Sequence, residues 1–130
     1  TVTRTDPRAD LRKVLGEGGQ HLGNGRSLVI FPQTTRTSRF EPDKFNSLGE
    51  KLASRAGVPV IPVAVKTDFW SPGRRLKDVG RILPERDVWI AFGEDLQSDG
   101  NQRTLHDKVV DFIASRVNRW QADEQEDVRE

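Results

Sequence analysis

The sequence contains no cysteine and no stretch of apolar residues long enough to cross a membrane. Without cysteine the protein can have neither a disulfide framework nor thiol chemistry, and zinc bound by cysteine is excluded as well. No apolar run approaches the roughly 18 residues of a membrane-spanning helix, and no signal peptide opens the chain. The chain begins on Thr-Val-Thr instead of Met, so we expect it to be a fragment of a longer protein.

Signatures of a serine hydrolase or of a metalloenzyme are missing too. There is no Gly-x-Ser-x-Gly elbow, and the two histidines, His21 and His106, are isolated and give no ligand cluster, so we expect no metal site. His106 and Asp111 have the spacing of a His-x-x-x-x-Asp pair, but both fall in the last predicted helix. We therefore interpret His106 as an ordinary, partly exposed helix residue.

Length and composition are those of one polar domain with a modest core. Of the 130 residues, 34% are apolar and 32% charged, and the formal net charge is +1. Residues 121–130 hold five acids and one arginine, which leaves a charge of +5 on residues 1–120. We predict a domain over residues 1–121 and an acidic, disordered tail over 122–130.

Hydrophobic spacing predicts alternating helices and strands. The predicted elements are a helix that starts at Asp6-Pro7, a strand over 27–31, a helix over 44–56 with Gly57 as its C-cap, strands over 58–65 and 87–92, and a helix over 105–120. The order indicates an α/β fold with a mixed or largely parallel sheet flanked by helices.

The run over 58–65 is apolar without interruption, which is typical of a strand buried on both faces. Pro59 and Pro62 cannot donate to a ladder, so we expect an edge strand or an irregular start.

A polar segment with one arginine follows the first predicted strand. Pro32 ends the apolar run, and the hydrogen-bonding side chains of Gln33, Thr34 and Thr35 come before Arg36. A buried strand that ends in such a loop is a common way to build an anion site, because the guanidinium binds two oxygens at once. A polar surface turn is the alternative interpretation.

The segment IFPQTTRTSRF, residues 30–40, resembles the Phe-Pro-Glu-Gly-Thr-Arg-Ser block of the glycerolipid acyltransferases, the family of 1-acyl-glycerol-3-phosphate acyltransferase. Its surroundings resemble the family as well. Gly25-Arg26-Ser27 matches the Gly-x-Ser before the block, and the sequence over 57–63 matches a Gly-Val-Pro-x-x-Pro-Val strand. The resemblance covers roughly residues 2–95 and identifies the chain as the C-terminal portion of such a domain.

The resemblance implies transfer of a fatty acyl group from acyl-coenzyme A or acyl carrier protein to a lipid hydroxyl, without a cofactor, in phospholipid biosynthesis. Arg36 would hold the acceptor's anionic group, Arg4 would assist, and Gln33, Thr34 and Thr35 would line the same site. The family's base, a His-x-x-x-x-Asp pair, lies upstream of this chain, so we expect no catalytic residue here and no activity of the fragment alone. The full-length enzyme would be cytoplasmic and associate with the membrane surface.

Two departures from the family pattern leave the acceptor open. Gln33 and Thr34 replace Glu-Gly, which removes a charge and adds a Cβ. The sequence over 45–48, FNSL, lacks the lysine of a Phe-Lys-x-Gly pattern. The alternative function is a non-catalytic anion- or lipid-binding module on the same scaffold. A nucleic-acid binder is disfavoured by the small net charge; it would use the basic groups Arg36, Arg39, Arg74, Arg75 and Lys77.

Overall fold

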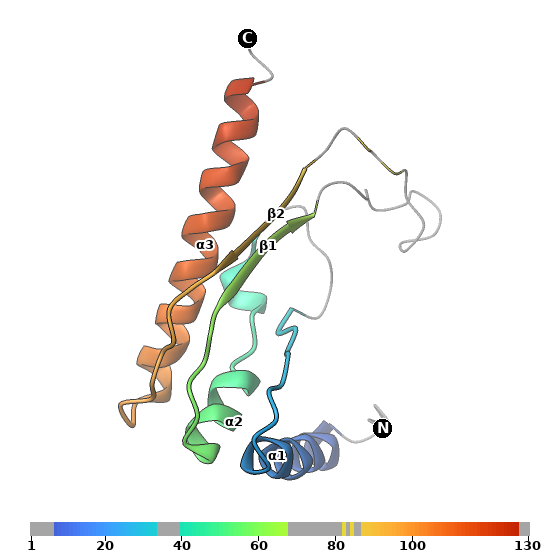
Figure 1. Ribbon diagram of the computed structural model, residues 1–130, viewed down its shortest axis with the longest axis vertical. Coiled ribbons are helices and arrows are strands. Elements are labelled where there is room, and N and C mark those ends of the chain that lie inside the picture. The colour runs from blue at the N-terminus through green and yellow to red at the C-terminus, as the bar shows by residue number, and fades with distance from the viewer. Residues whose placement is uncertain (1–6, 34–39, 68–81, 83, 85–86, 128–130) are drawn as a thin grey trace. The chain divides into compact units, whose positions relative to one another are not determined.

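The computed structural model describes residues 7–33, 40–67, 82, 84 and 87–127 of the chain (Figure 1). In order, its elements are α1 (Pro7–Gly23), a 3₁₀ turn η1 (Pro42–Lys44), α2 (Leu48–Ala56), β1 (Val63–Thr67), β2 (Val88–Phe92) and α3 (Gln102–Asp127). The chain divides into two compact units. The first comprises residues 1–60 and 95–108, and the second comprises 61–94 and 109–130, so that α3 begins in one unit and ends in the other.

In the first unit, α1 and α2 pack closely at a glycine. A Cβ on Gly18 would lie 2.8 Å from Leu52 Cδ2, and Leu52 is 2% exposed. α1 starts at Pro7, as the sequence predicts, and ends in a turn where Gly25 has a φ of 73°. α2 ends at Gly57, whose φ of 66° is left-handed and whose N–H donates to Ala53 O. The predicted C-cap is therefore confirmed.

The prediction of a buried strand over residues 27–31 is wrong for this structure. The segment forms no ladder there, and Val29 and Phe31 are 83% and 85% exposed. A strand needs a neighbour to pair its N–H and C=O groups and to cover its side chains. Among the described residues, the pairing of this region is limited to an isolated antiparallel bridge between Gln33 and Phe45.

In the second unit, β1 and β2 form an antiparallel pair whose register runs from Val63 opposite Phe92 to Thr67 opposite Val88. This pair confirms the strand predicted over 87–92, and β1 begins only after Pro62, in agreement with the expected irregular start. The α/β class is supported, whereas the parallel part of the sheet stays a prediction, since the strands described here are antiparallel.

Only one face of this strand pair is covered. Ala64 and Lys66 are buried, whereas Val63 and Val65 are exposed, so the prediction that the apolar run is buried on both faces is wrong. The C-terminal half of α3 packs on the covered face (Figure 1), where the rings of Trp89 and Trp120 stack with centroids 6.1 Å apart. The other face has a continuous set of exposed apolar side chains: Val63, Val65, Val88, Ile90 and Phe92.

α3 confirms the amphipathic helix predicted over 105–120 and extends it at both ends. Asn101 caps its start, because its Oδ1 accepts hydrogen bonds from the backbone N–H groups of Arg103 and Thr104 at 3.1 and 3.3 Å. The buried residues Leu105, Val109, Ile113 and Val117 recur at every fourth position.

The predicted disordered tail needs correction, because α3 continues to Asp127 and so includes residues 122–127. The physical reason is an ion pair that composition does not indicate. Glu124 Oε1 lies 2.6 Å from Nζ of Lys66, whose side chain is 2% exposed. An acidic residue near the C-terminus of a helix opposes the helix dipole, but here it neutralises a buried cation. Residues 128–130 lie outside the described residues.

Among the residues that the structure describes, no helix has the length and hydrophobicity needed to cross a membrane.

Candidate functional site

Of the five predicted site residues, Gln33 is the one that the structure describes. Arg4, Thr34, Thr35 and Arg36 lie outside the described residues. Gln33 is half-buried, and its backbone bridges to Phe45 in the stretch that leads into α2. The structure therefore places the start of the predicted anion-binding segment against the residues that precede α2.

Asn46 links the start of the predicted anion-binding segment to α2 through hydrogen bonds. Its backbone N–H and its side-chain Nδ2 both donate to the carbonyl oxygen of Pro32, at 3.3 and 2.6 Å. Its Oδ1 accepts a hydrogen bond of 3.1 Å from the N–H of Leu48, the first residue of α2. In the sequence alone, Asn46 is notable only because it replaces the lysine of the family's Phe-Lys-x-Gly pattern. In the structure one side chain links the end of the 27–33 segment to the first turn of the helix.

Phe45 contacts the same segment through its backbone and is itself packed against two other rings. It is 9% exposed, and its ring packs edge-on against Phe40 with the centroids 5.6 Å apart. The ring of His106 lies 6.0 Å from it at an interplanar angle of 44°. Aromatic contacts of this kind contribute about 0.5–1.5 kcal/mol beyond the area that they bury. Phe45 therefore joins the backbone beside Gln33 to the first turns of α3.

His106 in turn is held by a buried carboxylate on α2. Its Nδ1 lies 2.9 Å from Oε1 of Glu50, and the two side chains are 23% and 4% exposed. A carboxylate only accepts hydrogen bonds, so Nδ1 carries the hydrogen and donates it to Glu50. The interpretation of His106 as a partly exposed helix residue is confirmed, but its partner was not predicted.

The formal His-x-x-x-x-Asp match of His106 with Asp111 has no geometric counterpart. Five residues apart on a helix, the two side chains point in directions about 140° apart, as follows from 3.6 residues per turn. The carboxylate that His106 meets comes instead from Glu50, 56 positions away in the sequence. One signal could have suggested Glu50, because it stands three residues before the apolar Ala53 and so shares its helix face.

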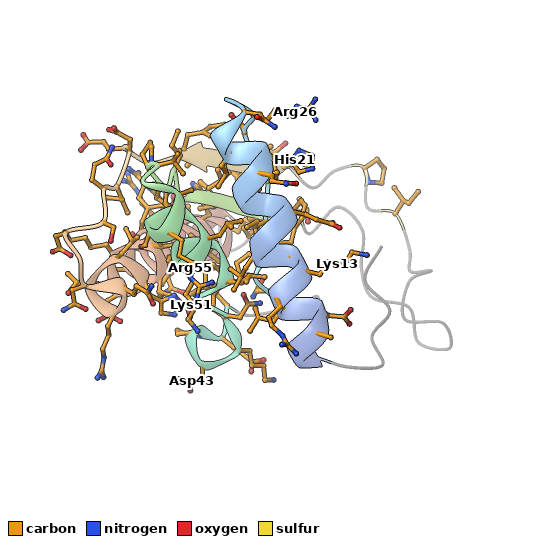
Figure 2. The ribbon with its side chains drawn as sticks, turned by 90° about the horizontal axis from the view of Figure 1, so that it is seen from below. Lys13, His21, Arg26, Asp43, Lys51 and Arg55 are labelled. Atoms are coloured by element: carbon orange, nitrogen blue, oxygen red, sulfur yellow. The ribbon has the colours of Figure 1, made fainter. Side chains whose placement is uncertain are left out.

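Basic side chains of the first unit lie at its surface (Figure 2). Lys13 and His21 project from α1 and Arg26 from the turn after it, while Lys51 and Arg55 lie one turn apart on α2. All five are exposed. Two of them contact each other, with Arg26 Nη1 3.4 Å from His21 Nδ1. Arg36, the predicted anion-binding residue, lies outside the described residues.

No three histidine, aspartate or glutamate side chains in the described part of the chain lie close enough together to hold a metal ion. At the start of the predicted anion-binding segment, the described contacts are the hydrogen bonds from Asn46 to the Pro32 carbonyl and the backbone bridge between Gln33 and Phe45. The ring of Phe45 in turn contacts His106, which pairs with Glu50.

Comparison with known proteins supports the family that the Arg36 block suggests. The chain is 35% identical over 120 residues to the 1-acyl-sn-glycerol-3-phosphate acyltransferase of Pseudomonas aeruginosa, and the match covers 92% of this chain. In structure it is similar to the 1-acyl-sn-glycerophosphate (LPA) acyltransferase PlsC of Thermotoga maritima, with a TM-score of 0.61 and 27% identity over 86% of this chain. Both comparisons support the assignment of the chain to the glycerolipid acyltransferase family. A scan against models of protein families gave no match.

The match confirms the family recognised from the Arg36 block, and it reaches beyond residues 2–95, since it covers 120 positions. The chain spans 43% of the Pseudomonas enzyme and 46% of the Thermotoga enzyme.

Proposed function

We propose that this chain is part of an enzyme that transfers a fatty acyl group from acyl-coenzyme A or acyl carrier protein to the hydroxyl of a lysophospholipid or related lipid precursor. The observation that carries the proposal is the similarity along almost the whole chain to two enzymes named as acyltransferases of 1-acyl-glycerol phosphate. The reaction belongs to phospholipid biosynthesis, and the enzyme works on the cytoplasmic side, at the membrane surface where its product resides.

In this proposal Arg36 binds the anionic group of the acceptor through its two-pronged guanidinium, and Arg4 assists. Gln33, Thr34 and Thr35 surround that group with neutral donors and acceptors. The anchored backbone at Pro32 and Gln33 supports this assignment, because it gives the segment that carries Arg36 a fixed origin.

The base that activates the acceptor hydroxyl belongs to a part of the enzyme beyond this chain. We do not assign this role to His106, because the family's His-x-x-x-x-Asp pair stands before the Arg36 block in the sequence, whereas His106 follows that block. The chain alone should therefore be inactive, and acyl transfer by residues 1–130 without further sequence would contradict this proposal.

The test is free-thiol release from acyl-coenzyme A and from acyl carrier protein by the full-length protein, with a panel of lipid hydroxyl acceptors. Arg36→Ala should raise the acceptor KM about 10- to 100-fold, because a hydrogen bond to a charged group contributes about 1.5–3 kcal/mol. Arg39→Ala, three residues further along, is the matched control and should leave this KM within about twofold. No thiol release with any acceptor, from a folded protein, would favour the non-catalytic binding module.

A further inference from the structure

Glu50 is in an unusual position for a glutamate on a short helix. Its side chain is 4% exposed, on a helix whose other buried residues are Leu52 and Ala53. Burying a carboxylate costs several kcal/mol unless a donor compensates for the lost water. An acidic residue in the first turn interacts well with the helix dipole from an exposed position too, so the dipole does not explain the burial.

The donor that compensates Glu50 also contacts the ring beside the anion-binding segment. His106 Nδ1 donates to Glu50 Oε1 at 2.9 Å, and the imidazole then packs on Phe45 with the centroids 6.0 Å apart. Phe45 bridges to Gln33 through its backbone, and Asn46 holds the Pro32 carbonyl. Phe45 therefore links the Glu50–His106 pair to Gln33, the first residue of the segment. All these residues lie in the first unit.

The hydrogen bond between His106 and Glu50 orients the imidazole ring, which apolar packing alone would not do. Two apolar side chains of similar size would fill the same space and often stabilise a fold as well as an ion pair does. A ring held only by packing turns about its terminal torsion, whereas the bond from Nδ1 to Glu50 sets the plane of the imidazole. The plane of that ring determines the surface on which Phe45 rests.

We propose that Glu50 and His106 are positioning residues of the acceptor site, which set the backbone of Gln33 through Phe45. The inference rests on the proposed function, since it names the acceptor segment as the element that is positioned. The pair does not touch the reacting atoms. Losing it should weaken the binding of the acceptor and leave the chemical step and the thioester donor almost unaffected.

The decisive variant is the double substitution Glu50→Leu with His106→Phe in the full-length enzyme. It removes both polar groups together, so no uncompensated charge stays buried, and it keeps a ring against Phe45. We expect its acceptor KM to rise about tenfold, the effect of one charge-assisted hydrogen bond, with kcat and the donor KM within about twofold of the wild type.

Two further variants separate positioning from stability. The single variant Glu50→Gln keeps a side-chain oxygen that accepts from His106 Nδ1, so its acceptor KM should equal that of the wild type. His21→Phe, the same change at the chain's other histidine, is the control and should have no effect. An unchanged acceptor KM in a double variant that is folded by circular dichroism would overturn the proposal.

Hydrogen exchange distinguishes failure of this inference from failure of the proposed function. In the same full-length double variant, the amide of Asn46, which donates to Pro32 O, should exchange about tenfold faster than in the wild type if the support is loosened. This readout needs no catalysis. If the wild type releases no thiol, the proposed function fails. Unchanged exchange at Asn46 in the double variant would then refute the positioning role independently.

Discussion

The ion pair between Lys66 and Glu124 leads to a prediction that tests whether α3 is ordered where composition predicts a disordered tail. Lys66 is 2% exposed in its side chain and lies 2.6 Å from Glu124, whose side chain is 26% exposed. Removing one partner of a buried pair costs about 3–5 kcal/mol. Since Glu124 is partly solvated, we expect Glu124→Ala to lower the free energy of unfolding by about 3 kcal/mol, at the low end of that range.

The assay is urea denaturation of the chain, followed by circular dichroism and by tryptophan fluorescence, which reports on the Trp89–Trp120 stack. Asp123→Ala is the matched control, because Asp123 is the exposed neighbour of Glu124 on the same helix, and it should change stability by less than about 0.5 kcal/mol. Adding Lys66→Met to Glu124→Ala should recover about 1–3 kcal/mol, the usual coupling of residues in contact. If Glu124→Ala lowered the free energy of unfolding by less than about 0.5 kcal/mol, the ion pair would be refuted and the predicted disordered tail would be supported.

The remaining predictions concern the core and the open face of the strand pair. Leu105→Ala, at a side chain that is 2% exposed, should cost about 2–5 kcal/mol in urea denaturation, whereas Leu11→Ala, 42% exposed, should cost less than about 0.5 kcal/mol. Equal costs would contradict the placement of the core. Ile90→Thr on the open face, 57% exposed, should leave stability unchanged and reduce the binding of an apolar dye, whereas Ile113→Thr, 9% exposed, should destabilise the chain by about 2 kcal/mol. Another surface would bind the dye if a variant with an intact open face bound less of it, or if Ile90→Thr bound as much of it as the wild type does.

Sequence reasoning succeeded where the determinants are local. The start of α1 at Pro7 and the end of α2 at Gly57 depend on the backbone geometry of single residues, and both are as predicted. The apolar face of α3 follows from a spacing of three and four residues within one helix. The family was recognised for the same reason, because the Arg36 block is a short contiguous motif.

The features that sequence reasoning missed depend on residues far apart in the chain. Glu50 meets His106 across 56 positions, and Lys66 meets Glu124 across 58. A glutamate on a helix is usually solvated, and an acidic terminal stretch is usually disordered. Neither pattern reveals that a donor for the carboxylate lies on another element, so both pairs became visible only from the structure.

The two wrong predictions of burial share one cause. An uninterrupted apolar run indicates that a strand has neighbours on both faces, but it does not identify them. Residues 27–31 have no paired neighbour among the described residues, and β1 is covered only on the face of Ala64 and Lys66. This chain spans less than half the length of each of the two related enzymes. An apolar run therefore predicts the surroundings that a strand is suited to. The strand is buried only when the chain itself supplies those surroundings.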